Sequence, residues 1–297
     1  MHWFGDRRRL GRIVRPAGAV VLVCLVGWLV LAGCSQPIAT PIPTVAPPTP
    51  AEVIIIGYSD SVQPLMDLAF PVFSAQAAAP ELVVELGNAV TVWDGLVSGR
   101  LDGVVLLDRP DGQRCGSNTG AEDGYWSTVV ALDGLAMVVH SDNRVNGLAL
   151  TETRSLFRGQ TTSWRSLGGT DMVVEVVTRE TGSDAGRLFD QLVMREHRTT
   201  LTAVVVPGSE AAIEYVRLHP AAIGYVGAAF TDAGVRTVAV EGVLPSPATI
   251  GDGTYPLTGP VCFVSRMEPE GGLRQVVSWL LNREGQSVIG QRYGRVR

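Results

Sequence analysis

Over the greater part of this chain, short apolar runs alternate with segments of helical spacing. Val53–Ile56, Leu82–Leu86 and Val104–Leu107 are runs of mostly branched apolar residues. Runs of this length, bounded by polar and glycine residues, are typical of buried strands. Segments with helical spacing follow the first two runs, at about 64–77 and 90–98. Strands that alternate with helices predict an α/β fold, with mixed sheets flanked by helices.

The same alternation continues to the end of the chain. An apolar stretch at Val129–Val139 is broken by Asp133-Gly134, and Thr151 is a candidate cap for a short helix. From residue 52 the body has about 245 residues, which suffices for one large domain or two lobes. The remaining predicted strands are Met172–Val177, Val204–Val206, Ile223–Val226, Val235–Val240 and Val261–Val264, and the remaining helices are 151–157, 183–195, 210–218, 271–282 and 284–291.

The N-terminal segment has the pattern of an export signal. Five Arg residues precede the apolar run Ala17–Leu31, which is shorter than the roughly 20 residues of a membrane span. The run ends in Leu31-Ala32-Gly33-Cys34, which resembles a bacterial lipobox. That resemblance implies a lipoprotein signal peptide at 1–33, cleavage before Cys34, and a diacylglycerol on its sulfur. The alternative is an uncleaved signal anchor in which Cys34 is incidental.

Residues 35–50 are rich in proline and threonine and carry no charge. Such a segment cannot bury a core and adopts extended conformations. Together with Cys34, we expect 34–51 to be a semi-rigid tether between a lipid anchor and the body. The protein would then lie outside the cytoplasm, on the outer face of the cell membrane.

Charge argues against one class of partner. The chain contains no Lys and has a net charge of −5. Residues 1–33 hold five Arg and one Asp, a net charge of +4, so the remainder carries −9. An acidic body with scattered Arg is unsuited to nucleic-acid binding.

Four cysteines are present, at positions 24, 34, 115 and 262. Cys24 lies in the expected signal and Cys34 is the expected lipid site. Cys115 and Cys262 remain as an even pair in an oxidising compartment, where a disulfide is plausible. Two free buried thiols are the alternative, because separation in sequence says nothing of distance in space.

The segment from Arg179 to Phe189 has the chemistry of an anion site. It follows a predicted strand and opens a predicted helix, and Ser183 is a good N-cap residue. Free backbone N–H groups and the helix dipole favour an anion at such a point, and the Arg179 guanidinium adds a bidentate donor. The alternative is a capped helix start that faces solvent.

This segment resembles a motif of the phosphate-binding proteins of ABC importers, Arg-Glu-x-Gly-Ser-Gly-Thr-Arg-x-x-Phe. Five positions match that spacing, and other family segments follow in the same order over most of residues 53–291. The matching positions are Arg179, Glu180, Gly182, Ser183 and Phe189; the other segments are 57–65, 150–169, 223–226, 255–264 and 280–289.

The resemblance implies a two-lobed periplasmic-binding-protein fold of type II, whose lobes close on a small oxyanion. It places lobe 1 at 52–137 and 255–297 and lobe 2 at 138–254, with two crossing strands, at Asp133–Val139 and Tyr255–Phe263, as the hinge. Residues carried over by position as ligand-binding are Arg179, Ser183, Asp184, Ser59, Asp60, Ser61, Asn88 and Asp108.

Some of these positions depart from the family's pattern. Asp60 stands where a Thr is usual, Asn88 where a Ser is usual, and Asp184-Ala185 replace Gly-Thr. A carboxylate about 4 Å from a phosphate charge costs on the order of 4 kcal/mol at an effective dielectric near 20. Phosphate binding therefore requires Asp60 and Asp184 to be turned away or protonated. Alternatively, the carboxylate of Asp184 itself occupies the anion position.

The resemblance implies a monomeric solute receptor that needs no cofactor or metal and works with ABC permease subunits. A degenerate relative that acts as a surface sensor or scaffold, or that binds a non-phosphate ligand, is the second hypothesis. A hydrolase is the third, but Ser59 and Ser61 lack a Gly-x-Ser-x-Gly elbow, so we expect no enzyme. The dispersed His140, His197 and His219 predict no zinc site, and the Trp residues 93, 126, 164 and 279 are expected to pack rather than stack on a ligand.

Overall fold

The computed structural model describes residues 52–116, 124–231 and 234–296. The predicted signal peptide at 1–33 and the predicted tether at 34–51, which includes Cys34, lie outside the described residues. Within the described ranges, no helix has the length and apolar character needed to cross a membrane.

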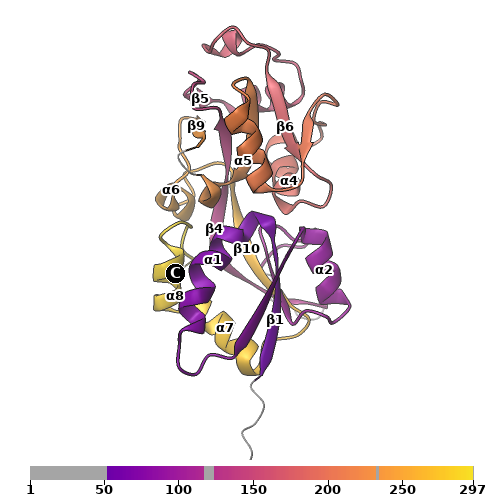
Figure 1. The fold of residues 1–297 in the computed structure, drawn as a ribbon, viewed down its shortest axis with the longest axis vertical. Coiled ribbons are helices and arrows are strands. Elements are labelled where there is room, and N and C mark those ends of the chain that lie inside the picture. The colour runs from indigo at the N-terminus through magenta and orange to yellow at the C-terminus, as the bar shows by residue number, and fades with distance from the viewer. Residues whose placement is uncertain (1–51, 117–123, 232–233, 297) are drawn as a thin grey trace, which may run out of the picture. The chain divides into compact units, whose positions relative to one another are not determined.

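The first lobe is built on three parallel strands (Figure 1). In it β1 (Val53–Ser59) pairs with β2 (Glu81–Gly87) on one side and β3 (Gly103–Leu106) on the other. Parallel neighbours need crossover connections, and α1 (Gln63–Ser74) and α2 (Ala89–Val97) supply them. The carboxyl ends of β1, β2 and β3 therefore meet at one edge of the sheet. There Ser59 ends β1, and Asn88 and Leu107 follow β2 and β3.

Two long antiparallel strands connect the lobes. β10 (Thr258–Ser265) pairs with β3 and with the first part of β4 (Trp126–Val139). Thr258 lies opposite Gly134, and from Leu135 onward β4 pairs instead with strands of the second lobe. β4 thus belongs to both halves of the sheet.

Asp133-Gly134 interrupts the apolar stretch in the sequence but not the strand, because β4 runs through both residues. A Cβ at Gly134 would lie 2.9 Å from the ring of Tyr255. Gly134 therefore makes room for an aromatic side chain on the neighbouring segment, and it does not mark a turn.

The second lobe continues the sheet beyond β4. Its strands β6 and β8 are parallel neighbours, β7 is the outer strand beside β6, and β9 pairs with both β4 and β5. The bounds of its elements are β5 (Gly147–Leu148), α3 (Leu150–Phe157), β6 (Glu175–Arg179), α4 (Asp184–Phe189), β7 (Val204–Val206), α5 (Ser209–Leu218), β8 (Ala222–Gly227), β9 (Arg236–Val240) and α6 (Pro247–Gly251).

Several boundaries differ from the sequence prediction. The strand predicted at Met172–Val177 is shifted to Glu175–Arg179. The helix predicted at 183–195 is α-helical only in α4 and continues as a π-helix over Asp190–Met194. α3 begins at Leu150 and not after a Thr151 cap, because the Glu152 carboxylate accepts a 2.8 Å hydrogen bond from the N–H of Ala149.

The chain returns to the first lobe at its C-terminal end. α7 (Gly271–Leu281) and α8 (Arg283–Ile289) contact each other and α1. In Figure 1 the indigo N-terminal strands and the yellow C-terminal helices lie together, and the orange elements form the other half. Lobe 1 is therefore the half built on β1–β3 with α1, α2, α7 and α8, and lobe 2 is the half built on β5–β9 with α3–α6.

Cys115 and Cys262 form a disulfide, with a Cα–Cα distance of 5.7 Å. Both residues pack in a cluster of lobe 1 that includes Trp93 and Val104. Cys262 lies on β10 opposite Leu106 of β3. The disulfide therefore fastens the loop before β4 to lobe 1 and does not cross to lobe 2.

Candidate functional site

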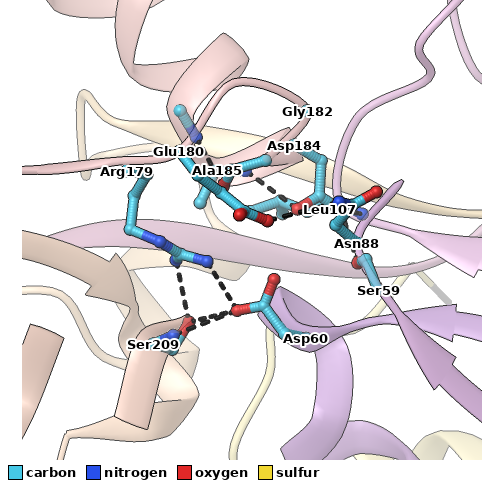
Figure 2. Close-up of polar contacts among 12 residues, drawn as sticks. Ser59, Asp60, Asn88, Leu107, Arg179, Glu180, Gly182, Asp184, Ala185 and Ser209 are labelled. Carbon is cyan, nitrogen blue, oxygen red and sulfur yellow. Dashed lines mark hydrogen bonds and ion pairs between the residues drawn. The ribbon is translucent and has the colours of Figure 1, made fainter. Parts of the chain in front are cut away.

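Asp60 and Arg179 form an ion pair between the lobes (Figure 2). Asp60 begins a short 3-10 helix, Asp60–Val62, after β1, and Arg179 is the last residue of β6. Nη2 of Arg179 lies 2.7 Å from Oδ2 of Asp60, and the two side chains are 1% and 15% exposed. Limited solvent makes this attraction stronger than it would be on the surface.

Ser209, the first residue of α5, completes the contact. Its N–H and its hydroxyl donate to Oδ2 of Asp60 at 3.0 and 3.1 Å, and Nη1 of Arg179 donates to its Oγ at 3.1 Å. One oxygen of Asp60 thus accepts three donors from lobe 2, at the positive end of a helix. Ser209 was not among the residues predicted from the sequence. The sequence feature that could have indicated it is the pair Gly208-Ser209 between a strand and a helix, which repeats the arrangement at Gly182-Ser183.

Asp184 reaches in the opposite direction, from lobe 2 into lobe 1. Its Oδ2 accepts the hydroxyl of Ser59 at 2.5 Å and the N–H of Leu107 at 2.8 Å. Its Oδ1 accepts the N–H of Ala185 at 2.9 Å, at the start of α4. Asp184 is fully buried, so these three donors replace the water that its carboxylate lost.

The two lobes therefore exchange carboxylates. Asp60 of lobe 1 is held by donors of lobe 2, and Asp184 of lobe 2 is held by donors of lobe 1. Both aspartates lie at the contact between the lobes, at the position where the resemblance placed an oxyanion. The interlobe seat is the set of residues that make these contacts, namely Ser59, Asp60, Leu107, Arg179, Asp184 and Ser209.

Ser183 lies beside the seat, but its hydroxyl is engaged within its own helix. It caps α4 by accepting the N–H of Gly186 at 3.1 Å. The backbone before it turns sharply at Gly182, where φ is +105° and a Cβ would lie 3.4 Å from Val90. Glycine is favoured there by conformation and by the close approach of lobe 1.

Two further predicted residues contact lobe 2 at the rim of the seat. Asn88 caps α2, and its amide donates to Glu180 at 3.3 Å. Asp108 forms an ion pair with Arg187 at 3.1 Å, and its backbone carbonyl accepts a second bond from the same guanidinium. Burial raises the pKa of the Asp108 carboxyl, and Arg187 opposes that rise.

Some buried polar atoms of this region lack a hydrogen-bond partner among the described residues. They are Oδ1 of Asp60, Oγ of Ser61 and Nε of Arg179. Ser61, a predicted ligand residue, is therefore buried beside the seat, and its hydroxyl makes no hydrogen bond within the described residues. The hydroxyl of Ser61 and Nε of Arg179 are donors that neither aspartate uses.

A cavity of about 360 Å³ adjoins the seat on the side of lobe 2. Its lining includes Arg179, Glu180, Ser183, Arg187 and Arg198. It offers hydroxyl and guanidinium groups next to the start of α4.

A buried carboxyl, Asp133, lies on β4 where the strand passes between the lobes. A Cβ at Gly227 would lie 2.7 Å from its Oδ2, which has no hydrogen-bond partner among the described residues. Burial raises the pKa of Asp133 to about 7, although N–H groups of Gly134, Ala228 and Ala229 lower it. The hinge thus contains an acid that titrates near neutrality.

Other predictions concern packing and metals. Trp164, Trp279 and Trp93 are buried in the core, as expected, at 0, 4 and 8% exposure. Across the described residues, no three His, Cys, Asp or Glu side chains are grouped so that they could hold a metal ion. Ser59 donates its hydroxyl to a carboxylate and not to a histidine.

Two lobes joined by crossing strands, with a polar seat between them, are the architecture of the periplasmic-binding-protein fold of type II. The chain matches the model of the PBP superfamily domain over residues 45–284, and it belongs to that family. The predicted two-lobed α/β fold of type II and the predicted family are therefore confirmed.

Several proteins that are similar to this chain have names that refer to phosphate. The phosphate-binding protein PstS of Bacillus subtilis is 24% identical over 240 residues, which cover 80% of this chain and 77% of that protein. A putative phosphate ABC transporter substrate-binding protein from Clostridium perfringens, solved with bound phosphate, has a TM-score of 0.74 at 23% identity. An ABC-type phosphate transport receptor from Vibrio cholerae has a TM-score of 0.64 at 24% identity. The two structures cover 83% and 82% of this chain, and the chain covers each of them fully.

Proposed function

We propose that this protein is the extracytoplasmic solute-binding component of an ABC import system, and that it binds phosphate or a similar small oxyanion between its lobes. The observation that carries the proposal is the placement of Arg179. It is a buried guanidinium that ends a strand of lobe 2 and faces the first loop of lobe 1. Arg is suited to planar, bidentate recognition of an oxyanion. The names of the relatives favour phosphate.

The ligand residues of this proposal are the donors of the interlobe seat and one hydroxyl beside it. Besides Arg179 they are the hydroxyls of Ser59 and Ser209 and the N–H of Leu107, which donate to Asp60 or Asp184 in the structure, and the buried hydroxyl of Ser61. Together with Arg179 they come from both lobes, so an anion among them would hold the lobes together. Binding would then stabilise the closed protein by mass action.

The membrane anchor of the proposal is the lipid on Cys34. A basic segment, a short apolar run and a small-residue site before cysteine support it. Two acyl chains give stable anchoring where one is marginal. The protein would act as a monomer that delivers its solute to permease subunits, and it would catalyse no reaction.

Thermal unfolding tests the ligand. The full chain in detergent would be melted in chloride alone and with millimolar phosphate or sulfate. Stabilisation by RT ln(1 + [L]/Kd) raises the melting temperature by a few degrees at about 100-fold excess over Kd. A rise that is specific to one oxyanion and absent in Arg179→Met supports the proposal. The absence of a rise with any oxyanion, in the wild type and in the aspartate variants described below, refutes it.

A second candidate function is supported by the aspartates themselves. Because Asp60 and Asp184 accept the donors of the seat, these contacts would hold the lobes together without a solute. A receptor that stays closed in this way would serve as a surface sensor or scaffold and not as an importer component. Normal growth on limiting phosphate after deletion of the gene would favour this candidate.

A further inference from the structure

We propose that Asp60 and Asp184 are built-in anions of the interlobe seat, which hold the lobes closed without a solute and set the selectivity of the seat by competing with any incoming oxyanion. This inference rests on the position of the seat in the proposed function. It assigns to the two aspartates a role opposite to that of ligand-binding residues.

The first argument is the number and origin of the donors. Oδ2 of Asp60 accepts from the guanidinium of Arg179 and from the N–H and hydroxyl of Ser209, all of lobe 2. Oδ2 of Asp184 accepts from Ser59 and Leu107, both of lobe 1. A free oxyanion that bridged two lobes would need the same kinds of donor, namely a guanidinium, hydroxyls and backbone N–H groups. The carboxylates therefore use the groups that would recognise a solute.

The second argument is that the contacts are reciprocal. Each lobe supplies one carboxylate and one set of donors, so opening the lobes would break both sets at once. Asp184 is fully buried and the Asp60 side chain is 15% exposed. Separating such charges from their donors is costly unless water or a solute replaces them. The exchange thus stabilises the closed arrangement in the way that a bound ligand would.

The third argument is chemical selectivity. An oxyanion that enters the seat meets two carboxylates that already neutralise Arg179 and the N–H groups. Like charges at such distances repel, so the oxyanion must displace the aspartates from their donors. A seat of this kind binds a phosphate ion weakly unless an aspartate is removed.

Single-amide hydrogen exchange of the full chain, freed of phosphate and sulfate, tests the closed state. The N–H groups of Leu107 and Ser209 donate to carboxylates of the opposite lobe, so their protection reports on lobe contact. We expect both amides to be protected in the wild type and to lose protection in Asp60→Asn/Asp184→Asn. The amide of Val105, inside the sheet of lobe 1, should stay protected in both and reports that the variant is folded.

Calorimetric titration with inorganic phosphate tests the competition. The double variant should bind phosphate at least about tenfold more tightly than the wild type, because two like charges are removed from the seat. Asp142→Asn is the control for the loss of a single negative charge, since it removes a carboxylate whose side chain is 86% exposed and makes none of the contacts of the seat. It should leave phosphate affinity unchanged. The family-like pair Asp60→Thr/Asp184→Gly repeats the test with different side chains.

The outcomes separate this inference from the proposed function. If Leu107 and Ser209 exchange as fast in the wild type as in the double variant, the aspartates do not hold the lobes and the inference is overturned. A measurable phosphate affinity that is equal in the wild type and in both double variants also overturns it. If the amides behave as expected but no protein binds phosphate or sulfate, the inference stands and the proposed oxyanion ligand is wrong.

Discussion

The hydroxyl of Tyr255 donates a 2.7 Å hydrogen bond to the backbone carbonyl of Leu135. Tyr255 leads into β10, and Leu135 is the residue of β4 at which pairing switches from lobe 1 to lobe 2. The N–H of Leu135 donates in turn to the carbonyl of Leu257 at 2.8 Å. The two connections between the lobes are therefore bonded to each other at the point where a hinge would bend.

Removal of the Tyr255 hydroxyl should weaken this point. Tyr255→Phe deletes a buried donor and is expected to lower the free energy of unfolding by about 1–2 kcal/mol. Urea denaturation measures the change. Tyr58→Phe is the control, because that hydroxyl makes no hydrogen bond within the described residues, and an equal loss in both variants would contradict the prediction.

Stability should depend on the titration of Asp133. Burial raises its folded-state pKa to about 7, above the value of 3.8 expected for an exposed Asp. Between these two pH values the folded state binds one proton more than the unfolded state. The contribution of this proton is therefore complete below about pH 4 and is lost as the pH rises through 7, at roughly 1.4 kcal/mol per pH unit.

Asp133→Asn should remove this pH-dependent contribution to the free energy of unfolding. The unfolding free energy of the wild type, measured by urea at pH 5 and pH 8, should fall with pH more steeply than that of the variant. The groups that face Asp133 include Asp184, Tyr255 and Tyr293, and both tyrosines have pKa values raised by burial. They stay neutral over this range, so parallel pH profiles in the two proteins would show that Asp133 does not titrate there.

The Cys115–Cys262 disulfide should stabilise lobe 1 and leave the lobe contact untouched. Cys115→Ser/Cys262→Ser is expected to lose about 2–4 kcal/mol of stability, since the bond closes a long loop. Non-reducing peptide mapping should find the two cysteines in one linked fragment. Because both sulfurs belong to lobe 1, protection of the Leu107 amide should persist in the double variant, and its loss would show that the bond supports the seat.

The ion pair at the seat should show strong coupling. Arg179→Met leaves Asp60 largely buried without its cation and should cost roughly 3 kcal/mol or more. Asp60→Asn/Arg179→Met removes both charges and should cost less than the single Arg179→Met change. A double-mutant cycle by urea denaturation measures the difference, and additive losses would contradict a direct interaction.

The sequence allowed prediction of the strands and the family, because buried parallel strands appear as short apolar runs. Val104 and Val105, both fully buried in β3, are of this kind. The helix after Ser183 was predicted too long as an α-helix. The segment continues as a π-helix, in which the carbonyl of Val193 accepts a 2.6 Å hydrogen bond from the side chain of Arg154. These two residues lie far apart in the sequence, so local patterns could not indicate this contact.

The contacts of the interlobe seat could not be predicted from local sequence patterns. The pairing of Asp60 with Arg179 spans 119 positions, and that of Ser59 with Asp184 spans 125. Sequence spacing indicated which residues would approach the gap, but not which oxygen would accept which donor. Ser183 illustrates why. A serine at the start of a helix is expected both for an N-cap and for an anion site, so the sequence could not distinguish the two roles, and the structure shows the N-cap.

The path of the chain through β4 and β10 has a consequence for protein engineering. The chain enters lobe 2 after Gly134 and leaves it before Thr258, and these two residues lie directly opposite each other in the sheet. Lobe 2 is thus an insertion into lobe 1, and the points at which the chain enters and leaves it are neighbours in the sheet. Exchanging this insertion with that of a related receptor would transfer Arg179 and Asp184 together. Each resulting hybrid would hold only one of Asp60 and Asp184 from this protein, and that aspartate would face the donors of the other receptor.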